Sequence, residues 1–328
     1  MSVVAGEGGV NELILTVTLN AALDLTYRVP RLTPHSSHRV REVIERPGGK
    51  GLNVSRVLAS LGLPTTATGF VGGDTGGELR GLLARSPGVT DALVTVAGRT
   101  RRTVGVVDES SGDTTQLNEP GPHISPEEWD GFLGTYRELL HAPPGRPGDR
   151  TGAVALCGSL PPGVPVGAYA TLVREARTAG VPVLLDTSGE PLRRGLAARP
   201  DIVKPNAHEL AGITGTAEPL RAARAAQRRG ARAVAASLGE DGMLLVTQDG
   251  AWSAGVPERL AGNPTGAGDS AVAGLLSGLA EGLPWPDRLA RSVALSAATV
   301  RAHAAGEFDT ETYERLLPGV HVETVETP

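Results

Sequence analysis

The sequence holds a single cysteine, Cys157, so no disulfide can form within the chain. It also lacks an apolar run near the roughly 20 residues that span a bilayer, and no charged leader precedes an apolar segment. Basic residues are fewer than acidic ones, 31 against 36, and the net charge of −5 argues against a broad polyanion-binding surface. We therefore expect a cytoplasmic protein that binds neither membranes nor nucleic acid.

Lysine is the scarcest charged residue. The sequence contains two lysines, Lys50 and Lys204, and 29 arginines. An ammonium group is a compact charge with rotatable donors, which the planar guanidinium cannot replace. The two lysines are therefore candidates for functional positions, with retention by chance as the alternative.

The length of 328 residues allows one large α/β domain or two ordinary ones. A β-branched, apolar segment at 13–19 predicts a buried strand, and from residue 151 onward short apolar strands alternate with helical stretches. We expect strands at 153–157, 183–186, 202–204 and 233–238, and helices near 169–179, 218–230, from about 268, and at 287–303. This alternation is typical of a mostly parallel sheet, whose ligands bind at the carboxyl ends of the strands.

Two segments outside this pattern, 24–46 and 99–118, alternate apolar and polar residues around short turns. Leu25, Tyr27 and Val29 alternate in the first segment, and Val104 and Val106 alternate in the second. Such alternation predicts strands with one apolar face. The two segments together predict a small sheet, separate from the main one.

The segment 265–270, TGAGDS, carries the sharpest chemical signal, at the start of a long predicted helix. Gly266, Ala267 and Gly268 would let backbone N–H groups approach an anion, which the helix dipole also favours. Asp269 in the first turn is placed to take a proton from a hydroxyl that attacks a bound phosphate. The alternative is an aspartate that only stabilises the helix N-terminus.

Other chemistries fit less well. Gly266, Gly268 and Ala271 match a dinucleotide-binding pattern, but no buried strand directly precedes them, so NAD binding is disfavoured. Lys50 is followed by glycine, which excludes a P-loop. The histidines show no metal-ligand spacing, and Cys157 is better read as a small core residue than as a nucleophile.

Three further loops carry polar groups at strand or helix ends. In the segment 48–53, Gly49 permits close approach to a ligand, while Lys50 and Asn53 offer an ammonium and an amide. The segment 204–209 combines a cation, an amide and a carboxylate, which are the groups that Mg-nucleotide binding needs. The segment 237–242 is a strand end followed by a turn. Each loop could also be an ordinary turn or a capped helix start.

Seven segments in this order resemble the PfkB (ribokinase-like) carbohydrate kinases, specifically the branch of 1-phosphofructokinases and tagatose-6-phosphate kinases. They are LTVTLNAALD (15–24), GGKGLNVSRVL (48–58), GRTR (98–101), CGSLPPG (157–163), VKPNAHEL (203–210), SLGEDG (237–242) and NPTGAGDS (263–270). The resemblance covers about residues 13–306. It implies a ribokinase-like three-layer α/β sandwich with a mostly parallel central sheet, formed by residues 13–23, 47–98 and 119–318. It also implies a β-sheet lid formed by residues 24–46 and 99–118.

The resemblance also implies the roles of individual residues. Lys50 and Arg101 would bind the existing phosphate of a phosphosugar, and Asp269 would be the catalytic base. The residues expected to bind this substrate are Asp24, Gly49, Lys50, Asn53, Arg101 and Ser159. The residues expected to bind Mg-ATP are Lys204, Asn206, Glu209, Ser237, Gly239, Gly242 and Gly268, with Glu209 holding Mg²⁺ through water. Gly266, Ala267 and Gly268 would stabilise the transferred phosphoryl group.

The sequence departs from the family at Ala21, Cys157 and Thr103, where proline, serine and asparagine are usual, and Asn263-Pro264 is closer to the tagatose-phosphate enzymes. We expect ATP-dependent phosphorylation of a ketohexose phosphate, with fructose 1-phosphate as the first candidate. The alternatives are tagatose 6-phosphate, fructose 6-phosphate, an unphosphorylated sugar or nucleoside, and a non-catalytic sugar-phosphate sensor. One apolar face of the lid needs a cover; the sugar covers part of it, and the resemblance implies that the lid of a second subunit covers the rest, so we expect a homodimer.

Overall fold

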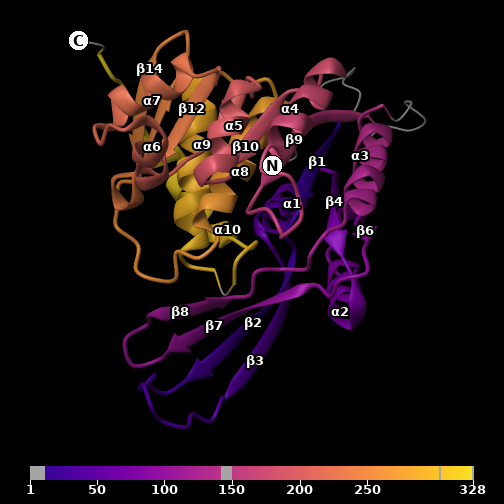
Figure 1. The fold of residues 1–328 in the computed structure, drawn as a ribbon. Coiled ribbons are helices and arrows are strands. Elements are labelled where there is room, and N and C mark those ends of the chain that lie inside the picture. Colours follow the sequence, from indigo (N-terminus) through magenta and orange to yellow (C-terminus); the bar gives the residue numbers. More distant parts are fainter. Residues whose placement is uncertain (1–11, 142–149, 303, 327–328) are drawn as a thin grey trace.

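A computed structural model describes residues 12–141, 150–302 and 304–326, whose strands form two sheets (Figure 1). The larger sheet has 11 strands in the order β15-β14-β13-β12-β11-β10-β9-β1-β4-β5, with β6 beside β4. All its pairs are parallel except those that involve β13, β14 and β15 at one edge. Its strands are β1 (Leu13–Thr18), β4 (Thr65–Val71), β5 (Val89–Asp91), β6 (Val94–Thr95), β9 (Thr151–Cys157), β10 (Val183–Asp186), β11 (Ile202–Val203), β12 (Ala233–Ser237), β13 (Met243–Val246), β14 (Ala251–Gly255) and β15 (His321–Thr324).

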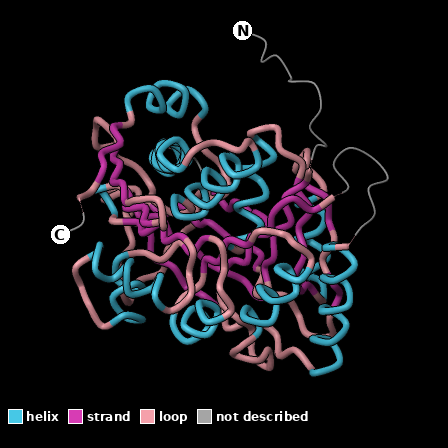
Figure 2. Tube along the Cα trace, turned by 90° about the horizontal axis from the view of Figure 1, so that it is seen from above, coloured by secondary structure: helices cyan, strands magenta, loops and turns pink. Residues whose placement is uncertain are grey.

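Helices cover both faces of this sheet, as the view from above shows (Figure 2). Along β1, Leu15 and Val17 pack into the core on one face, whereas Ile14 packs into the core on the other. The first core includes α3 (Pro126–Leu140), α4 (Ala168–Thr178), α5 (Gly189–Ala197), α6 (Ala207–Thr214) and α7 (Pro219–Arg228). The second includes α1 (Lys50–Ser60), α8 (Ala267–Ala280) and α9 (Trp285–Thr299). The other helices of the described ranges are α2 (Gly73–Leu83), α10 (Thr310–Leu316) and the short 3₁₀ helices η1 (Gly239–Asp241) and η2 (Leu317–Gly319). This three-layer arrangement confirms the predicted fold class.

The smaller sheet extends away from the main body (Figure 1) and is called the lid below. Its strands are β3 (Glu42–Gly48), β2 (Ala22–Val29), β7 (Arg101–Asp108) and β8 (Thr114–Asn118), in that order. The pair β2–β7 is parallel and the other two pairs are antiparallel. The sheet reaches two residues further toward the body than the predicted segment 24–46, because Ala22 still pairs with Gly48.

The two faces of the lid differ, as the alternation of apolar and polar residues predicts. One face carries Leu25, Val104 and Leu117 in one cross-strand row, and Tyr27 with Val43 in the next. On this face Val43 is 55% exposed and Leu117 is 61% exposed. The opposite face carries a polar row that consists of Arg46, Asp24, Thr103 and Asn118.

The clearest difference from the predicted elements is the end of α9, which ends at Thr299 and not near residue 303. The chain turns at Val300, so that the carbonyl of Ala305 accepts a hydrogen bond from Arg56 in α1 at 3.0 Å. This turn brings the segment 304–307 against the start of the site described below. Among the helices in the described ranges, none combines the length and the apolar character needed to cross a bilayer.

Candidate active site

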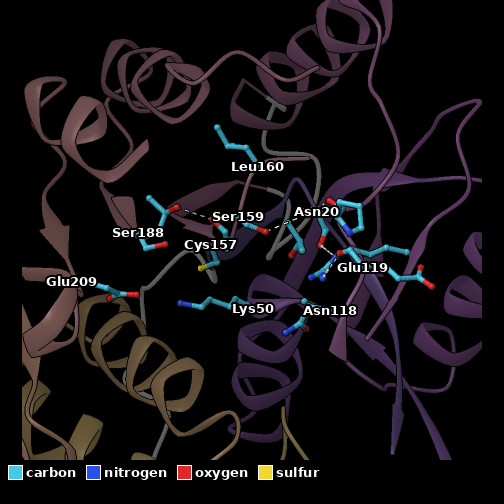
Figure 3. Close-up of a pocket in the computed structure, with 15 residues that line it drawn as sticks. Asn20, Lys50, Asn118, Glu119, Cys157, Ser159, Leu160, Ser188 and Glu209 are labelled. Carbon is cyan, nitrogen blue, oxygen red and sulfur yellow. Dashed lines mark hydrogen bonds between the residues drawn. The ribbon is translucent and has the colours of Figure 1, made fainter. Parts of the chain in front are cut away.

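A pocket of about 520 Å³ opens where the carboxyl ends of β1, β9 and β10 meet the inner end of the lid (Figure 3). Its lining includes Gly49, Lys50, Arg101, Ser159 and Glu209, which the sequence predicted as site residues. They come from four separate elements or loops: α1, the loop after β9 and α6 lie at the carboxyl edge of the main sheet, and Arg101 reaches this edge from β7 of the lid. In the close-up, the charged ends of Lys50 and Glu209 point toward each other from opposite sides of the pocket.

Both lysines of the chain bind one carboxylate, Asp186, at the end of β10. The Lys50 ammonium lies 3.3 Å from each carboxylate oxygen of Asp186, and the Lys204 ammonium lies 3.7 Å from one of them. Asp186 and Lys204 are buried, whereas the Lys50 side chain is 41% exposed toward the pocket. Burial would lower the pKa of Lys50, but the attraction of Asp186, followed by that of Asp269, raises it above its usual value. Lys50 is therefore charged at neutral pH.

The predicted anion-binding loop forms the N-terminus of α8. Gly266 caps this helix with φ of +89°, and a Cβ there would lie 2.9 Å from the Cα of Ala305. Only glycine fits this left-handed and crowded position. A Cβ on Gly268 would lie 3.5 Å from the Lys204 ammonium, so this cation lies beside the loop. The helix N-terminus and Lys204 together favour an anion at this place.

Asp269 lies in the first turn of α8 and is 6% exposed. Its carboxylate accepts a hydrogen bond of 2.8 Å from the Asn53 amide in α1. Burial raises the pKa of Asp269 to about 6, with Lys50 opposing this shift and Asp186 adding to it. The carboxylate is therefore mostly ionised at neutral pH and close enough in pKa to accept a proton in a reaction.

Asp24 lies in the polar row of the lid, against Gly48 of the neighbouring strand. A Cβ on Gly48 would lie 2.0 Å from the carboxyl carbon of Asp24, so glycine makes room for this side chain. Burial raises the pKa of Asp24 to about 6, against the attraction of Arg101 and a hydrogen bond from the Thr103 hydroxyl. Asp269 adds to the rise, which shows that the two carboxylates interact.

The residues predicted for the nucleotide form a second group, next to the pocket. Asn206 caps α6 and accepts a hydrogen bond from the backbone of Glu209, whose carboxylate accepts one from the backbone of Asn206, both at 2.8 Å. Ser237 at the end of β12 pairs with Asn206 through a single β-bridge. Gly242 follows with φ of +86°, and a Cβ there would lie 2.0 Å from the carbonyl oxygen of Ala254. The lining of the 520 Å³ pocket includes Glu209 but none of the other residues predicted for the nucleotide, and it also leaves out Asp24, Asn53 and Asp269.

Sequence reasoning missed Asp186 and Asn20, although both belong to the site. Asp186 has the signal of an acidic residue at the carboxyl end of a buried strand, in the loop region where ligands of parallel sheets bind. Asn20 lies within a quoted motif, directly after β1. Cys157 is fully buried in the core and also lines the pocket, and burial raises the pKa of its thiol, so it is no reactive nucleophile.

Comparisons with known proteins show which family the chain belongs to. A 1-phosphofructokinase of Bacillus subtilis is 35% identical over 94% of this chain and 99% of its own length, and one of Rhodobacter capsulatus is 40% identical over 87% and 90%. The crystal structure of phosphofructokinase-2 from Escherichia coli in complex with potassium superposes with a TM-score of 0.86 at 29% identity, over 94% of this chain and 98% of that one. Ribokinase of Arabidopsis thaliana, complexed with ribose and ATP, shares the fold with a TM-score of 0.71 at 23% identity, over 93% and 98%. The family described as pfkB family carbohydrate kinase matches residues 16–312, and the chain therefore belongs to the PfkB carbohydrate kinases.

Proposed function

We propose that this chain uses ATP to phosphorylate fructose 1-phosphate, with fructose 1,6-bisphosphate and ADP as products. The observation that carries the proposal is that two cations, Lys50 and Arg101, line one pocket, while the buried Asp269 interacts with Lys50. Lys50 already pairs with Asp186, and a phosphate on the acceptor would add charge-assisted hydrogen bonds with both cations, which a neutral sugar without an opposite charge cannot match. The relatives named 1-phosphofructokinase favour this substrate over the 6-phosphates of fructose and tagatose.

In the proposed reaction a hydroxyl oxygen of the phosphosugar attacks the γ-phosphorus of ATP, and the bond from this phosphorus to the ADP oxygen breaks. Asp269 accepts the hydroxyl proton, which its pKa of about 6 permits at neutral pH. The backbone N–H groups of 266–268 and the Lys204 ammonium would stabilise the charge on the transferred phosphoryl group. Asn53 orients the Asp269 carboxylate through its hydrogen bond of 2.8 Å.

The residues present fit Mg²⁺ bound together with ATP. In such sites Mg²⁺ keeps several waters and uses one or two carboxylates beside the nucleotide phosphates, so a cluster of protein ligands is not needed. In the described ranges no three His, Cys, Asp or Glu side chains form a metal-binding group. Glu209 lines the pocket at the start of α6 and would hold the ion through water. The ion would neutralise charge on the nucleotide phosphates.

We also infer a homodimer formed through the lid. The apolar face of the lid exposes Val43 and Leu117, and a second copy of this face would cover both. Replacing both by glutamate should shift the sedimentation coefficient to that of a monomer. A wild-type chain that sediments as a monomer at micromolar concentration would contradict the inference.

The expected cytoplasmic location stays a prediction, which cell fractionation would test.

The proposed function is tested by measuring ADP release from Mg-ATP with fructose 1-phosphate, fructose 6-phosphate, tagatose 6-phosphate, fructose and adenosine. We expect kcat/KM for fructose 1-phosphate to exceed that for the other acceptors. Turnover of only an unphosphorylated acceptor would remove Lys50 and Arg101 from the proposed phosphate site. If no acceptor is phosphorylated and phosphosugars still bind, the chain would be a sensor and the proposal would be wrong.

A further inference from the structure

Asn20 joins three segments of the pocket wall that are far apart in sequence. Its side-chain amide donates hydrogen bonds of 3.1 Å to the carbonyl oxygen of Pro120 and to the hydroxyl oxygen of Ser159. Its own backbone carbonyl accepts a hydrogen bond of 3.2 Å from the Nε of Arg101. Asn20 therefore contacts both Ser159 and Arg101, two of the residues predicted to bind the phosphosugar. The bond to Ser159 is visible in Figure 3.

The orientation of the Asn20 amide follows from its partners. The carbonyl of Pro120 can only accept a hydrogen bond, so the NH₂ group and not the amide oxygen must face it. The amide oxygen lies against Gly121, where a Cβ would be only 2.2 Å away, and it is buried without a hydrogen-bond partner among the described residues. Leaving such an acceptor unpaired destabilises a fold, so stability alone does not explain an asparagine here.

The bond from Asn20 constrains what the Ser159 hydroxyl can do. A serine hydroxyl has one donor and two acceptor lone pairs, and the Asn20 amide occupies one lone pair. The hydroxyl proton remains available to an acceptor in the pocket, which both residues line. A phosphate oxygen is such an acceptor. Donation from the amide also polarises the hydroxyl and strengthens its own donation.

Arg101 is held from the same side. Its Nε and Nη1 donate to the carbonyl oxygens of Asn20 and Glu119, both at 3.2 Å. A guanidinium group has five N–H donors, so in the described part of the chain three of them are left for an anion.

We propose that Asn20 is a positioning residue for phosphosugar binding, which orients the Ser159 hydroxyl as a donor toward the substrate phosphate. This inference rests on the proposed function, because it takes the pocket as the phosphosugar site. It assigns to Asn20 a role that acts through Ser159 and not through direct contact with the sugar. The Asn20 side chain and its backbone carbonyl then serve two different phosphate-binding groups.

A double-mutant cycle tests the proposal by steady-state kinetics with fructose 1-phosphate and Mg-ATP. We expect N20A to raise the KM for the phosphosugar about fivefold to tenfold, with the KM for ATP unchanged. In the S159A background the same substitution should raise it less than twofold, because the hydroxyl that Asn20 orients is absent. An equal fold-change in both backgrounds would overturn the proposal. N20A keeps the backbone carbonyl, so the bond to Arg101 is retained.

Asn118 provides a matched control, because it lines the same pocket and forms no hydrogen bond to Ser159 in the described structure. The effect of N118A should be the same in the wild-type and S159A backgrounds.

A crystal structure of N20A gives a readout that needs no substrate. We expect the Ser159 hydroxyl to leave its present rotamer or to occupy several, and one unchanged rotamer would overturn the proposal. Failure of the wild type to phosphorylate fructose 1-phosphate would count against the proposed function, and the crystal structure would still decide the role of Asn20.

Discussion

The main sheet and the lid differ in how far they are buried, and the difference separates the two tasks of the site. Every residue of β4 and β10 in the main sheet is buried, whereas no residue of β7 in the lid is fully buried. The body therefore has a close-packed core that fixes its loops before any ligand binds. The lid lacks such a core, and its polar row is held against the body by contacts such as the pair of Arg46 with Glu307. Groups that need exact placement for chemistry belong on the body, and groups that recognise the sugar can be shared with the lid.

The two carboxylates with raised pKa values illustrate this division. Burial raises the pKa of Asp24 in the lid and of Asp269 in the body to about 6. Asp269 lies at the N-terminus of α8, beside the anion-binding loop and Lys204. Asp24 lies on a strand of the lid, next to Arg101 and Thr103. Similar pKa values thus accompany different surroundings, and the roles that we propose are proton transfer for Asp269 and sugar recognition for Asp24.

The largest expected effect separates these two residues. D269N should lower kcat by about 10²–10⁴-fold, because the base is lost, while the KM values for ATP and phosphosugar change less than threefold. D24N should mainly raise the phosphosugar KM. Steady-state kinetics with each substrate varied in turn measures both. Near-normal turnover by D269N, or an equal loss of kcat in both variants, would contradict the proposal that Asp269 of the body transfers the proton and Asp24 of the lid binds the sugar.

The next effect concerns the two lysines that share Asp186. K50M should raise the phosphosugar KM about ten- to a hundredfold and leave the ATP KM unchanged, because a charge-assisted hydrogen bond to the phosphate is lost. K204M should act instead on kcat and the ATP KM, since Lys204 is buried beside Gly268. An unchanged phosphosugar KM in K50M would place the phosphate elsewhere.

Much of the site was predictable because its residues lie in short local motifs. The segments around Lys50, Lys204 and Asp269 each combine glycines or strand ends with a chemically distinctive side chain. In the structure both lysines pair with Asp186, whose charge also acts on Asp269. Asp186 itself is one of 36 acidic residues, and no motif with a characteristic spacing distinguishes it from the others. Its partners are 136 and 18 positions away along the chain, so only the folded sheet reveals the cluster.

Contacts between distant segments were not predictable for the same reason. Asn20 bonds to residues 100 and 139 positions away, and Glu307 bonds to Arg46 across 261 positions. The alternation of apolar and polar residues predicted the strands of the lid, because side chains along a strand point to opposite faces and one face of the lid is apolar. No period indicates which polar residue of the lid reaches back to the body. Such pairs depend on how the lid is set against the body, which local sequence does not encode.

A smaller effect links the raised pKa of Asp269 to stability. Burial raises the pKa of Asp269 from its ordinary value of 3.8 to about 6 in the folded protein, so the folded state binds a proton more tightly than the unfolded chain. The contribution of this group to stability is therefore present below pH 4 and is lost as the pH rises through 6. D269N should stabilise the protein by on the order of 1–2 kcal/mol at pH 7.5, with a rise in Tm of a few degrees. At pH 4 the variant and the wild type should melt at the same temperature. Thermal unfolding of both proteins at pH 4 and pH 7.5 measures this, and an equal difference in Tm at the two pH values would contradict the prediction.

The smallest expected effect concerns Glu307, which connects the lid to the body. Its carboxylate lies 3.3 Å from Nε of Arg46 in β3 and 2.8 Å from Nη2 of Arg56 in α1. The preceding Gly306 packs on Asn53, since a Cβ there would lie 3.0 Å from the Asn53 amide oxygen. Glu307 therefore links the polar row of the lid to the helix that orients Asp269. The pair with Arg46 is partly exposed, so its contribution is about 0.5–1 kcal/mol.

E307Q should consequently raise the phosphosugar KM only twofold to fivefold and leave kcat and the ATP KM unchanged. Backbone amides of β3 should exchange with solvent faster in hydrogen-exchange measurements, because the lid is held less firmly. The matched control is E258Q, which breaks an exposed pair with Arg315 away from the pocket and should change neither quantity. Faster exchange in β3 with an unchanged KM would show that the lid closes on the sugar without this contact. The proposed phosphosugar-binding residues would then position the lid without help from Glu307.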